Sequence, residues 1–280
     1  MRQLKGRVAV VTGAANGIGR ALSQAFAARG CELALVDVDV EGLERTAREV
    51  RAVAAKVSTH VVDVASKEQM QALPAKIIRE HGHIHILVNN AGVGIIATTM
   101  EQSIEDFEWI VGINLWGVIY GCKFFLPHLE GEEEGHIVNV SSLFGIIGVP
   151  TQASYSLTKF AVRGFSEALH AELAGTSVGL SVVHPGVIQT NIVQASRIAS
   201  GKRRSKLQKR FDRYAMSPER AAAKIIRAIE TNQQRVRIGK ETYLVDWAKR
   251  LFPDLTQRAL ANGYGRRKLR DRVRDEHELQ

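Results

Sequence analysis

The chain of 280 residues carries 38 Lys and Arg against 29 Asp and Glu, for a formal charge of +9, with 45% hydrophobic and 24% charged residues. This composition is ordinary for a globular protein, and it excludes a disordered, collagen-like or disulfide-rich chain. The charge is uneven, because the first 196 residues sum to −4 and the residues from Arg197 onward sum to +13. A uniformly basic surface is therefore not expected, and we predict no nucleic-acid partner.

No segment of the sequence predicts secretion, a membrane span or a metal site. The apolar run from Val8 to Val11 is too short for the core of a signal peptide, and no stretch approaches the roughly 20 apolar residues of a spanning helix. Cys31 and Cys122 are isolated and lack the spacing of metal ligands, so we expect two buried free thiols and no metal. We therefore expect a soluble, cytoplasmic protein.

Short β-branched runs alternate with helical stretches through residues 1–240. Strands are predicted over Val8–Thr12, Glu32–Asp37, Val57–Val64, Ile84–Asn89, Ile137–Ser141, Leu180–Val183 and Arg235–Ile238. Helices are predicted over Gly17–Arg29, Glu41–Ala54, Lys67–His81, Ile104–His128, Gln152–Ala174 and Pro218–Thr231, the last capped by Ser217. This alternation predicts a single α/β domain with a doubly wound, Rossmann-type parallel sheet.

Residues 191–216 lack periodicity and predict an excursion from the core, which could form a lid over the substrate. Its basic side chains could attract an anionic substrate. The alternative is that they only keep a mobile loop solvated. These residues are Arg197, Lys202, Arg203, Arg204, Lys206, Lys209, Arg210 and Arg213.

Residues 241–280 predict a basic C-terminal extension with helical structure, and not an independent domain. Glu241–Phe252 has the pattern of an amphipathic helix, and a charged tail begins at Gly263. Its apolar cluster is expected to pack on its own domain or on a partner subunit, with contact to a membrane surface as the alternative. The cluster consists of Tyr243, Leu244, Trp247, Leu251 and Phe252.

A glycine cluster follows the first predicted strand and opens the first predicted helix. Residues Thr12–Gly19 have the spacing G-x-x-x-G-x-G, in place of the G-x-G-x-x-G of the general dinucleotide fingerprint. Glycines allow a sharp turn and a close backbone approach, and a helix N-terminus attracts anions, so the loop is a candidate pyrophosphate site. An ordinary strand–turn–helix connection is the alternative. The candidate contacts are Gly13, Asn16, Gly17, Ile18 and Gly19.

Polar residues follow the next strands. Asp37 ends the second strand, where a carboxylate can accept hydrogen bonds from an adenosine ribose and repel a 2′-phosphate. NAD is therefore expected in preference to NADP, although a capping or turn role for Asp37 stays open. Asp63 and Val64 could contact the adenine or form a turn. Asn90 and Gly92, in the N-N-A-G segment, could hold the backbone against the cofactor or shape a turn.

Tyr155 and Lys159 lie four residues apart on a predicted helix, and therefore on one face of it. An ammonium group near a phenol favours the phenolate, so Tyr155 could exchange a proton with a substrate oxygen. Ser142 follows the fifth strand, where its hydroxyl could hold that oxygen. Asn114 is a polar amide in an apolar stretch, and it could anchor a water that relays protons from Lys159. An unrelated surface pair is the alternative for Tyr155 and Lys159 taken alone.

Together these features resemble the short-chain dehydrogenase/reductase family, in its subgroup with subunits of roughly 250 residues, over about residues 4–240. The resemblance rests on Thr12–Gly19, Asn89–Gly92, Asn114, Ser142, Tyr155, Lys159, Pro185-Gly186 and Thr190. It implies a tetrad of Asn, Ser, Tyr and Lys at the four candidate catalytic positions, with Lys159 also binding the nicotinamide ribose. It further implies nicotinamide contacts at Pro185, Gly186, Ile188 and Thr190, and a homodimer or homotetramer.

The expected activity is hydride transfer between NAD and the hydroxyl or carbonyl carbon of a hydrophobic secondary alcohol or ketone. The hydrophobic substrate follows from a mostly apolar candidate pocket, although some of its residues could belong to the core. A cofactor-sensing binding protein of the same fold, without turnover, is the alternative function. His184 is expected to be structural. The candidate pocket consists of Leu143, Phe144, Ile147, Gln152, Val187 and the excursion after Thr190.

Overall fold

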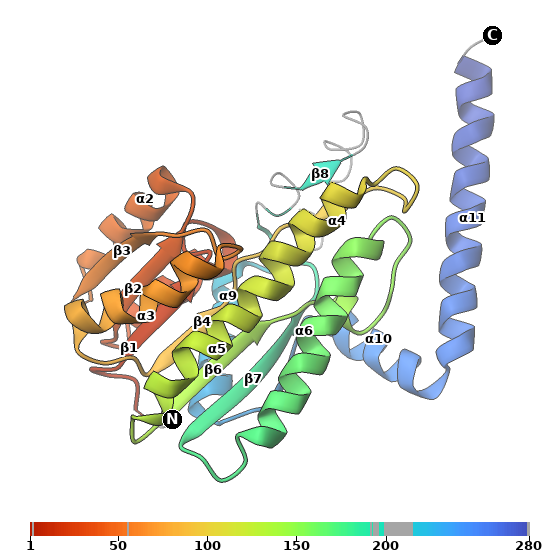
Figure 1. The fold of residues 1–280 in the computed structure, drawn as a ribbon. Coiled ribbons are helices and arrows are strands. Elements are labelled where there is room, and N and C mark those ends of the chain that lie inside the picture. The colour runs from red at the N-terminus through yellow and green to blue at the C-terminus, as the bar shows by residue number, and fades with distance from the viewer. Residues whose placement is uncertain (2, 55, 191, 193–195, 199–214, 279–280) are drawn as a thin grey trace.

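A computed structural model describes the chain except for residues 2, 55, 191, 193–195, 199–214 and 279–280. Its centre is a seven-stranded sheet in the order β3-β2-β1-β4-β6-β7-β9, with every neighbouring pair parallel (Figure 1). The strands are β1 (Val8–Thr12), β2 (Glu32–Asp37), β3 (Val57–Val61), β4 (Ile86–Asn89), β6 (Gly135–Val140), β7 (Val178–Pro185) and β9 (Arg235–Ile238). The doubly wound parallel sheet predicted from the sequence is thereby confirmed.

Helices cover both faces of this sheet, which explains why its central strands are buried along their whole length and mostly apolar. Every residue of β1, β4 and β6 is buried. One core cluster joins the sheet to α1 (Gly17–Ala27), α2 (Val40–Arg51) and α9 (Pro218–Glu230). The other joins it to α3 (Lys67–His81), α5 (Gly117–Glu130) and α6 (Ala153–Glu172).

Local capping fixes where several of these helices begin. Asp39, Ser66 and Ser217 each accept a hydrogen bond from a backbone N–H three residues along, in the first turn of α2, α3 and α9. Ser103 does the same for α4 (Ile104–Val111). The predicted N-cap at Ser217 is therefore confirmed.

The predicted helix Ile104–His128 is interrupted by a π-helical turn, η1 (Gly112–Trp116), between α4 and α5. The whole stretch Ile104–Glu130 is long and apolar enough to cross a membrane by length and composition, which corrects the expectation that no segment is. This is weak support for a span, because the same stretch packs on α3 and carries the buried Asn114. We interpret it as a helix of the folded domain.

Other boundaries also differ from prediction. The third strand ends at Val61, so Asp63 and Val64 lie in the following turn and not on the strand. Two short strands, β5 (Ile95–Ile96) and β8 (Arg197–Ile198), pair in parallel beside the main sheet, and η2 (Leu143–Gly145) follows β6.

The C-terminal extension is helical throughout its described length. Helix α10 (Lys240–Leu251) begins directly after β9, and α11 (Pro253–Glu278) follows it, so the charged tail predicted from Gly263 continues a helix. Figure 1 shows α11 standing away from the sheet, at the end of the molecule that carries α10.

Candidate active site

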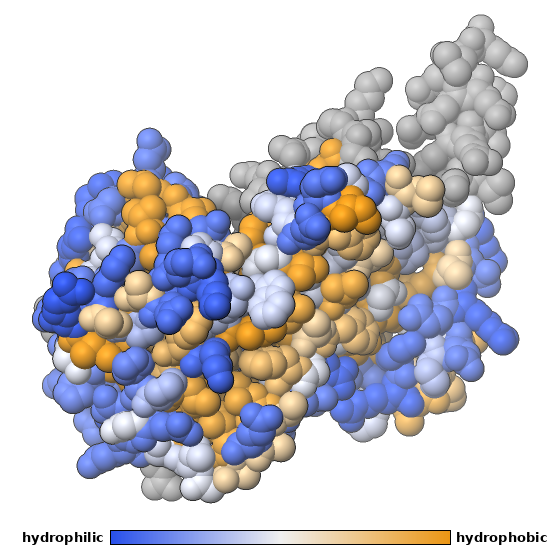
Figure 2. Space-filling view, viewed as in Figure 1, coloured by the Kyte–Doolittle hydropathy of each residue, from blue (hydrophilic) through white to orange (hydrophobic). Residues whose placement is uncertain are grey.

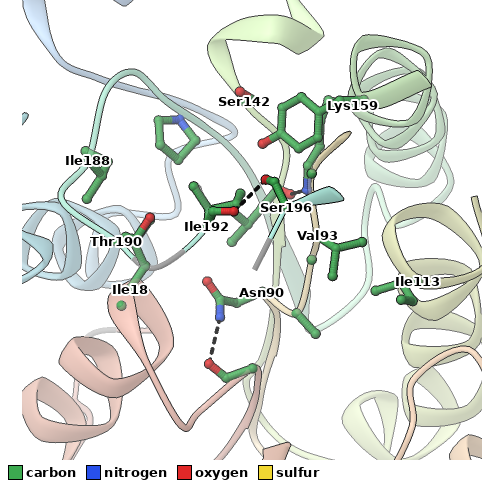
Figure 3. A pocket seen from close by; sticks show the side chains of 18 of the residues that line it. Ile18, Asn90, Val93, Ile113, Ser142, Lys159, Ile188, Thr190, Ile192 and Ser196 are labelled. Atoms are coloured by element: carbon green, nitrogen blue, oxygen red, sulfur yellow. Dashed lines mark hydrogen bonds between the residues drawn. The ribbon is translucent and has the colours of Figure 1, made fainter. Parts of the chain in front are cut away.

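A cavity of about 530 Å³ lies at the carboxyl ends of the sheet strands, where open parallel sheets bind ligands. Figure 3 shows Lys159 and Ser142 near one end of it, and Ile18 and Thr190 near the glycine loop. Apart from Gly19 and Asn114, every catalytic and cofactor-binding residue predicted from the sequence lines this cavity. These are Gly13, Asn16, Gly17, Ile18, Asp37, Asp63, Val64, Asn90, Gly92, Ser142, Tyr155, Lys159, Pro185, Gly186, Ile188 and Thr190.

The glycine loop brings the N-terminus of α1 to the cavity wall. Gly13 and Gly17 have φ of 66° and 54°, a region that side chains other than glycine rarely adopt. A Cβ on Gly19 would overlap the carbonyl oxygen of Gly13, so Gly19 shapes the loop from behind and does not line the cavity. In the part of the chain that the structure describes, the Asn16 side chain does not cap α1, and Gly17 and Ile18 of the first turn line the cavity, where a helix N-terminus attracts an anion. This arrangement fits a pyrophosphate.

Two carboxylates stand at the end of β2. Asp37 accepts hydrogen bonds from the backbone N–H groups of Ala15 at 2.9 Å, Val38 at 2.8 Å and Asp39 at 3.0 Å. These bonds fix its orientation and leave acceptor capacity for a ribose hydroxyl. Asp39, which the sequence reasoning missed, also lines the cavity and accepts a hydrogen bond from the Asn16 side-chain amide at 3.1 Å. An aspartate before a helix, such as Asp39 before α2, is a typical N-cap in a sequence, but the sequence does not show that Asp39 lies next to Asn16.

Asp63 and Asn90, which were predicted to contact the adenine and to hold the backbone against the cofactor, each stabilise a turn beside the cavity. Asp63 accepts a hydrogen bond from Ala65 N–H at 2.9 Å, as expected of a turn residue. Asp63 and Val64 both line the cavity. The Asn90 side-chain amide donates to the carbonyl oxygens of Thr12 at 2.9 Å and Gly13 at 3.2 Å. Asn90 therefore ties the turn after β4 to the glycine loop.

Tyr155 and Lys159 project from one face of α6, with the lysine Nζ 5.7 Å from the centroid of the tyrosine ring. Lys159 is buried, and its ammonium donates a hydrogen bond to the Val140 carbonyl oxygen at 3.0 Å. Its own backbone carbonyl accepts from the Ser141 hydroxyl at 2.7 Å. The end of β6 thus binds the second turn of α6 through Lys159, which places Tyr155 beside Ser142.

Burial changes the acid–base properties of both groups. It raises the pKa of Tyr155 above its ordinary value, and the hydrogen bond with the Ser142 side chain lowers it only in part. Burial also lowers the pKa of Lys159 to about 8. The sequence argument expected a lysine ammonium to lower the pKa of Tyr155, whereas in the protein without ligand burial raises it and the lowering comes from the Ser142 hydrogen bond.

Asn114 lies behind the cavity wall, in the π-helical turn. Its side-chain oxygen accepts from Val93 N–H at 2.8 Å, and its amide donates to the Val93 carbonyl oxygen at 2.9 Å and to the Thr158 hydroxyl at 3.2 Å. A Cβ on Gly92 would lie 3.2 Å from the Asn114 oxygen and 3.4 Å from Lys159 Nζ. Asn114 therefore fixes the segment that separates it from the cavity.

Two hydrogen bonds fix the end of β7 and the loop that follows it. His184 is fully buried, and its Nδ1–H donates to the Ser142 carbonyl oxygen at 3.1 Å. Burial lowers the pKa of His184 to about 4, so the ring is neutral, in agreement with a structural role. Glu241, at the start of α10, accepts a hydrogen bond from Val187 N–H at 3.0 Å, and a Cβ on Gly186 would clash with its carboxylate. Sequence reasoning missed Glu241, because the contact spans 54 residues.

The substrate side of the cavity is mainly apolar. The predicted Leu143, Phe144, Gln152 and Val187 line it, whereas Ile147 is buried in the core away from the lining, which corrects that assignment. Val93, Gly94, Ile96, Ile113, Ile192 and Ser196 complete this part of the wall.

One end of the predicted lid is anchored on α4. The Arg197 guanidinium lies 3.9 Å from the centre of the Trp109 ring and forms an ion pair with Asp106 at 2.7 Å. The other basic residues assigned to the lid fall outside the described part of the chain: Lys202, Arg203, Arg204, Lys206, Lys209, Arg210 and Arg213.

A cluster of His83, His85 and Glu132 lies at the opposite, amino-terminal end of the sheet, with ligand-type atoms within 4.8 Å of one another. It is a poor metal site, because His85 Nδ1 accepts a hydrogen bond from Val8 N–H at 3.1 Å. The His85 Nε2 must then carry the proton of the neutral ring, and it has no lone pair for a metal. Cys31 and Cys122 are buried free thiols, as predicted.

Comparison with known proteins agrees with this geometry. The family described as short chain dehydrogenase matches residues 7–200. A Mycobacterium tuberculosis protein named as the oxidoreductase SadH is 40% identical over 267 residues, which cover 94% of this chain and 97% of that protein.

Two solved structures are also similar. A Burkholderia phymatum short chain dehydrogenase/reductase in complex with NAD has a TM-score of 0.83 at 31% identity, covering 91% of this chain and 96% of the other. An alcohol dehydrogenase from Thermococcus sibiricus, complexed with 5-hydroxy-NADP, has a TM-score of 0.71 at 27% identity, covering 84% and 95%. The chain is therefore an oxidoreductase with a nicotinamide cofactor, and it belongs to the short-chain dehydrogenase/reductase family.

Proposed function

We propose that this chain is an NAD(H)-preferring dehydrogenase/reductase that interconverts a hydrophobic secondary alcohol and its ketone, with Tyr155 as the acid/base. The observation that carries the proposal is the meeting of Tyr155, Ser142 and Lys159 in one largely apolar cavity with the glycine loop. When bound there, the nicotinamide cofactor supplies or accepts the hydride.

Tyr155 moves the proton at the substrate oxygen. In ketone reduction its hydroxyl donates a proton to the carbonyl oxygen as that oxygen gains negative charge, and in alcohol oxidation the phenolate accepts the hydroxyl proton. Ser142 donates a hydrogen bond to the same oxygen and so orients the reacting carbon. Lys159 favours the phenolate through its charge and offers its free N–H groups to the nicotinamide ribose, while Asn114 holds the backbone beside Lys159 in place.

The preference for NAD rests on Asp37 and Asp39. Both carboxylates line the cavity at the end of β2, and neither forms an ion pair with Lys or Arg in the described residues. Their combined negative charge would repel a 2′-phosphate, while Asp37 accepts from the ribose hydroxyls. Gly13, Asn16, Gly17 and Ile18 would hold the pyrophosphate.

The hydrophobic substrate class rests on the side chains around the reacting centre. Val93, Ile96, Ile113, Leu143 and Phe144 offer no charged partner for a substrate, and the Phe144 ring meets Tyr155 edge-on with centroids 6.0 Å apart. Burial of an apolar chain here gains free energy at about 25 cal/mol per Å².

We further propose a cytoplasmic homodimer or homotetramer, supported by an exposed apolar face on α5 and α6. Figure 2 shows apolar side chains gathered over α4, α5 and α6. The exposed Trp116, the last residue of η1, stacks on Tyr120 of α5 with ring centroids 5.5 Å apart, and Tyr120 stacks on Phe124 at 5.9 Å, both of these rings being partly buried. Leu157 and Phe160 of α6 are exposed as well.

The test is NADH oxidation by the purified protein over a panel of ketones, with NAD reduction over the matching alcohols. We expect turnover with ketones that carry an apolar chain, and weaker turnover when the chain is shortened or charged. Tight NADH binding without turnover on any of them would instead favour the cofactor-sensing alternative.

A further inference from the structure

Helix α10 presents apolar side chains to the outside, while the side chains that it buries are polar. Thr242 and Asp246 are buried against β9, whereas Leu244, Trp247 and Leu251 lie on the opposite side of the helix. This is the reverse of the pattern of an ordinary surface helix, whose apolar face packs on the core. The outward apolar side chains therefore need another explanation than packing within this domain.

Polar contacts fix α10 in this orientation. Asp246 forms ion pairs at 2.8 Å with both Arg235 and Arg237 of β9, and the Thr242 hydroxyl donates to the Ile238 carbonyl oxygen at 3.0 Å. A rotation that buried the apolar face would leave the Asp246 carboxylate and two arginines without these partners. Breaking such a buried pair is costly, so the outward direction of the apolar face is a stable property of the fold.

The apolar face continues beyond α10. Phe252, between the two helices, and Leu255, in the first turn of α11, are exposed in the same region of the chain. We name these side chains the outer stripe: Leu244, Trp247, Leu251, Phe252 and Leu255, each between 55% and 72% exposed. Contiguous apolar side chains of this kind mark an interaction surface, whereas scattered single ones do not.

The exposed charges around the outer stripe are mostly positive. The acidic groups of α10 are turned inward, because Glu241 binds Val187 N–H and Asp246 binds the arginines of β9. Among residues 240–266, Asp254 is then the remaining acidic residue, and it is exposed. The basic residues of the same range are Lys240, Lys249, Arg250, Arg258 and Arg266. Residues 267–280 add five basic and four acidic residues, for a net charge of +1, so the basic border lies mainly in residues 240–266.

We propose that the outer stripe and its basic border dock the protein on an anionic lipid surface. Leu, Trp and Phe side chains flanked by Lys and Arg are the composition of a helix that lies in the interface of a membrane. A second copy of the chain fits less well, because a two-fold contact across the stripe would bring the basic borders of both copies together.

The direct test is flotation of the full-length protein with vesicles of phosphatidylcholine alone or with 30 mol% phosphatidylglycerol, a fraction on the order of that in anionic membranes. We expect binding to the anionic vesicles that weakens as salt rises. The variant Leu244→Ser/Trp247→Ser/Leu251→Ser should lose at least about tenfold in affinity. The variant Lys240→Gln/Arg258→Gln should lose about fivefold for each charge, at about 1 kcal/mol per basic residue.

Controls separate docking from misfolding and from self-association. The matched variant Met100→Ser/Ile104→Ser also removes exposed apolar side chains, outside the outer stripe at the start of α4, and should bind like the unmodified protein. Trp247 fluorescence should shift to shorter wavelength on anionic vesicles, and Trp247→Phe should abolish that shift. NADH binding should be unchanged in every variant, which keeps this test independent of the proposed catalytic function.

Two results would overturn the proposal. One is equal flotation with neutral and anionic vesicles, or none with either. The other is a fall in the molecular mass of the triple serine variant in sedimentation, which would show that a second copy covers the outer stripe.

Discussion

Replacement of Glu241 by Ala should weaken NADH binding although Glu241 does not line the cavity. The carboxylate accepts Val187 N–H at 3.0 Å, and its bulk fits against Gly186 and Gly239. Its loss frees the loop that carries the predicted nicotinamide contacts Gly186 and Ile188. A hydrogen bond to a charged acceptor contributes about 1.5–3 kcal/mol. Because Glu241 and Val187 are both partly exposed, we expect about 1.5 kcal/mol, or a roughly tenfold higher Kd for NADH.

The assay is NADH titration by fluorescence, with steady-state kinetics on the same protein. Glu241→Gln keeps a carbonyl acceptor and should restore most of the affinity, which a change of bulk alone would not explain. Glu105→Ala removes a matched first-turn acid from α4, away from the loop, and should bind NADH normally. If Glu241→Ala binds NADH like the unmodified protein, the link between α10 and the nicotinamide loop is wrong.

Three further outcomes are expected. Asp37→Ala should narrow the preference for NADH over NADPH, measured as the ratio of the two dissociation constants, and an unmodified protein that prefers NADPH would contradict the reasoning. Gly19→Ala should abolish cofactor binding in the same titration, because its Cβ would overlap the Gly13 carbonyl oxygen. Gly148→Ala places its Cβ in open space and should leave the Kd for NADH unchanged. Acid should destabilise the fold, because burial lowers the pKa of His136 to about 3 and of His184 to about 4, below the ordinary 6.5. The free energy of unfolding is therefore highest above pH 6.5 and falls as the histidines of the unfolded chain take up protons, by about 2 kcal/mol for each histidine at pH 5. Equal urea midpoints at pH 7 and pH 5 would refute this.

The sequence predicted the parts of the site that depend on local pattern. The glycine loop and the Tyr155–Lys159 pair each lie within one short segment, so their spacing alone determines which groups share a face. The main strands and their parallel, doubly wound sheet followed from the alternation of apolar runs and helices. All of these agree with the structure.

What the sequence did not predict depends on contacts between distant segments. Strands β5 and β8 have two residues each, too few for a periodic pattern, and they form because Ile95 pairs with Arg197, 102 residues further along the chain. The π-helical turn at Asn114 carries the same apolar pattern as its flanking helices. Ile147 is apolar and follows the fifth strand, as a pocket residue would, but it is buried in the turn after η2 and does not line the cavity. The tail from Gly263 was predicted only as charged, because a polar composition gives no apolar periodicity from which its helix could be assigned.

The central claim is that Tyr155 transfers the proton, and the most direct measurement is the kcat of Tyr155→Phe beside its Kd for NADH. The substitution removes one hydroxyl and keeps the ring that meets Phe144 edge-on. We expect kcat to fall by at least ~10²-fold, the low end for general acid–base catalysis, with the Kd nearly unchanged. Tyr120→Phe, which removes a hydroxyl from the α5 face, should leave both values as they are. A Tyr155→Phe protein that turns over at the normal rate would contradict the mechanism.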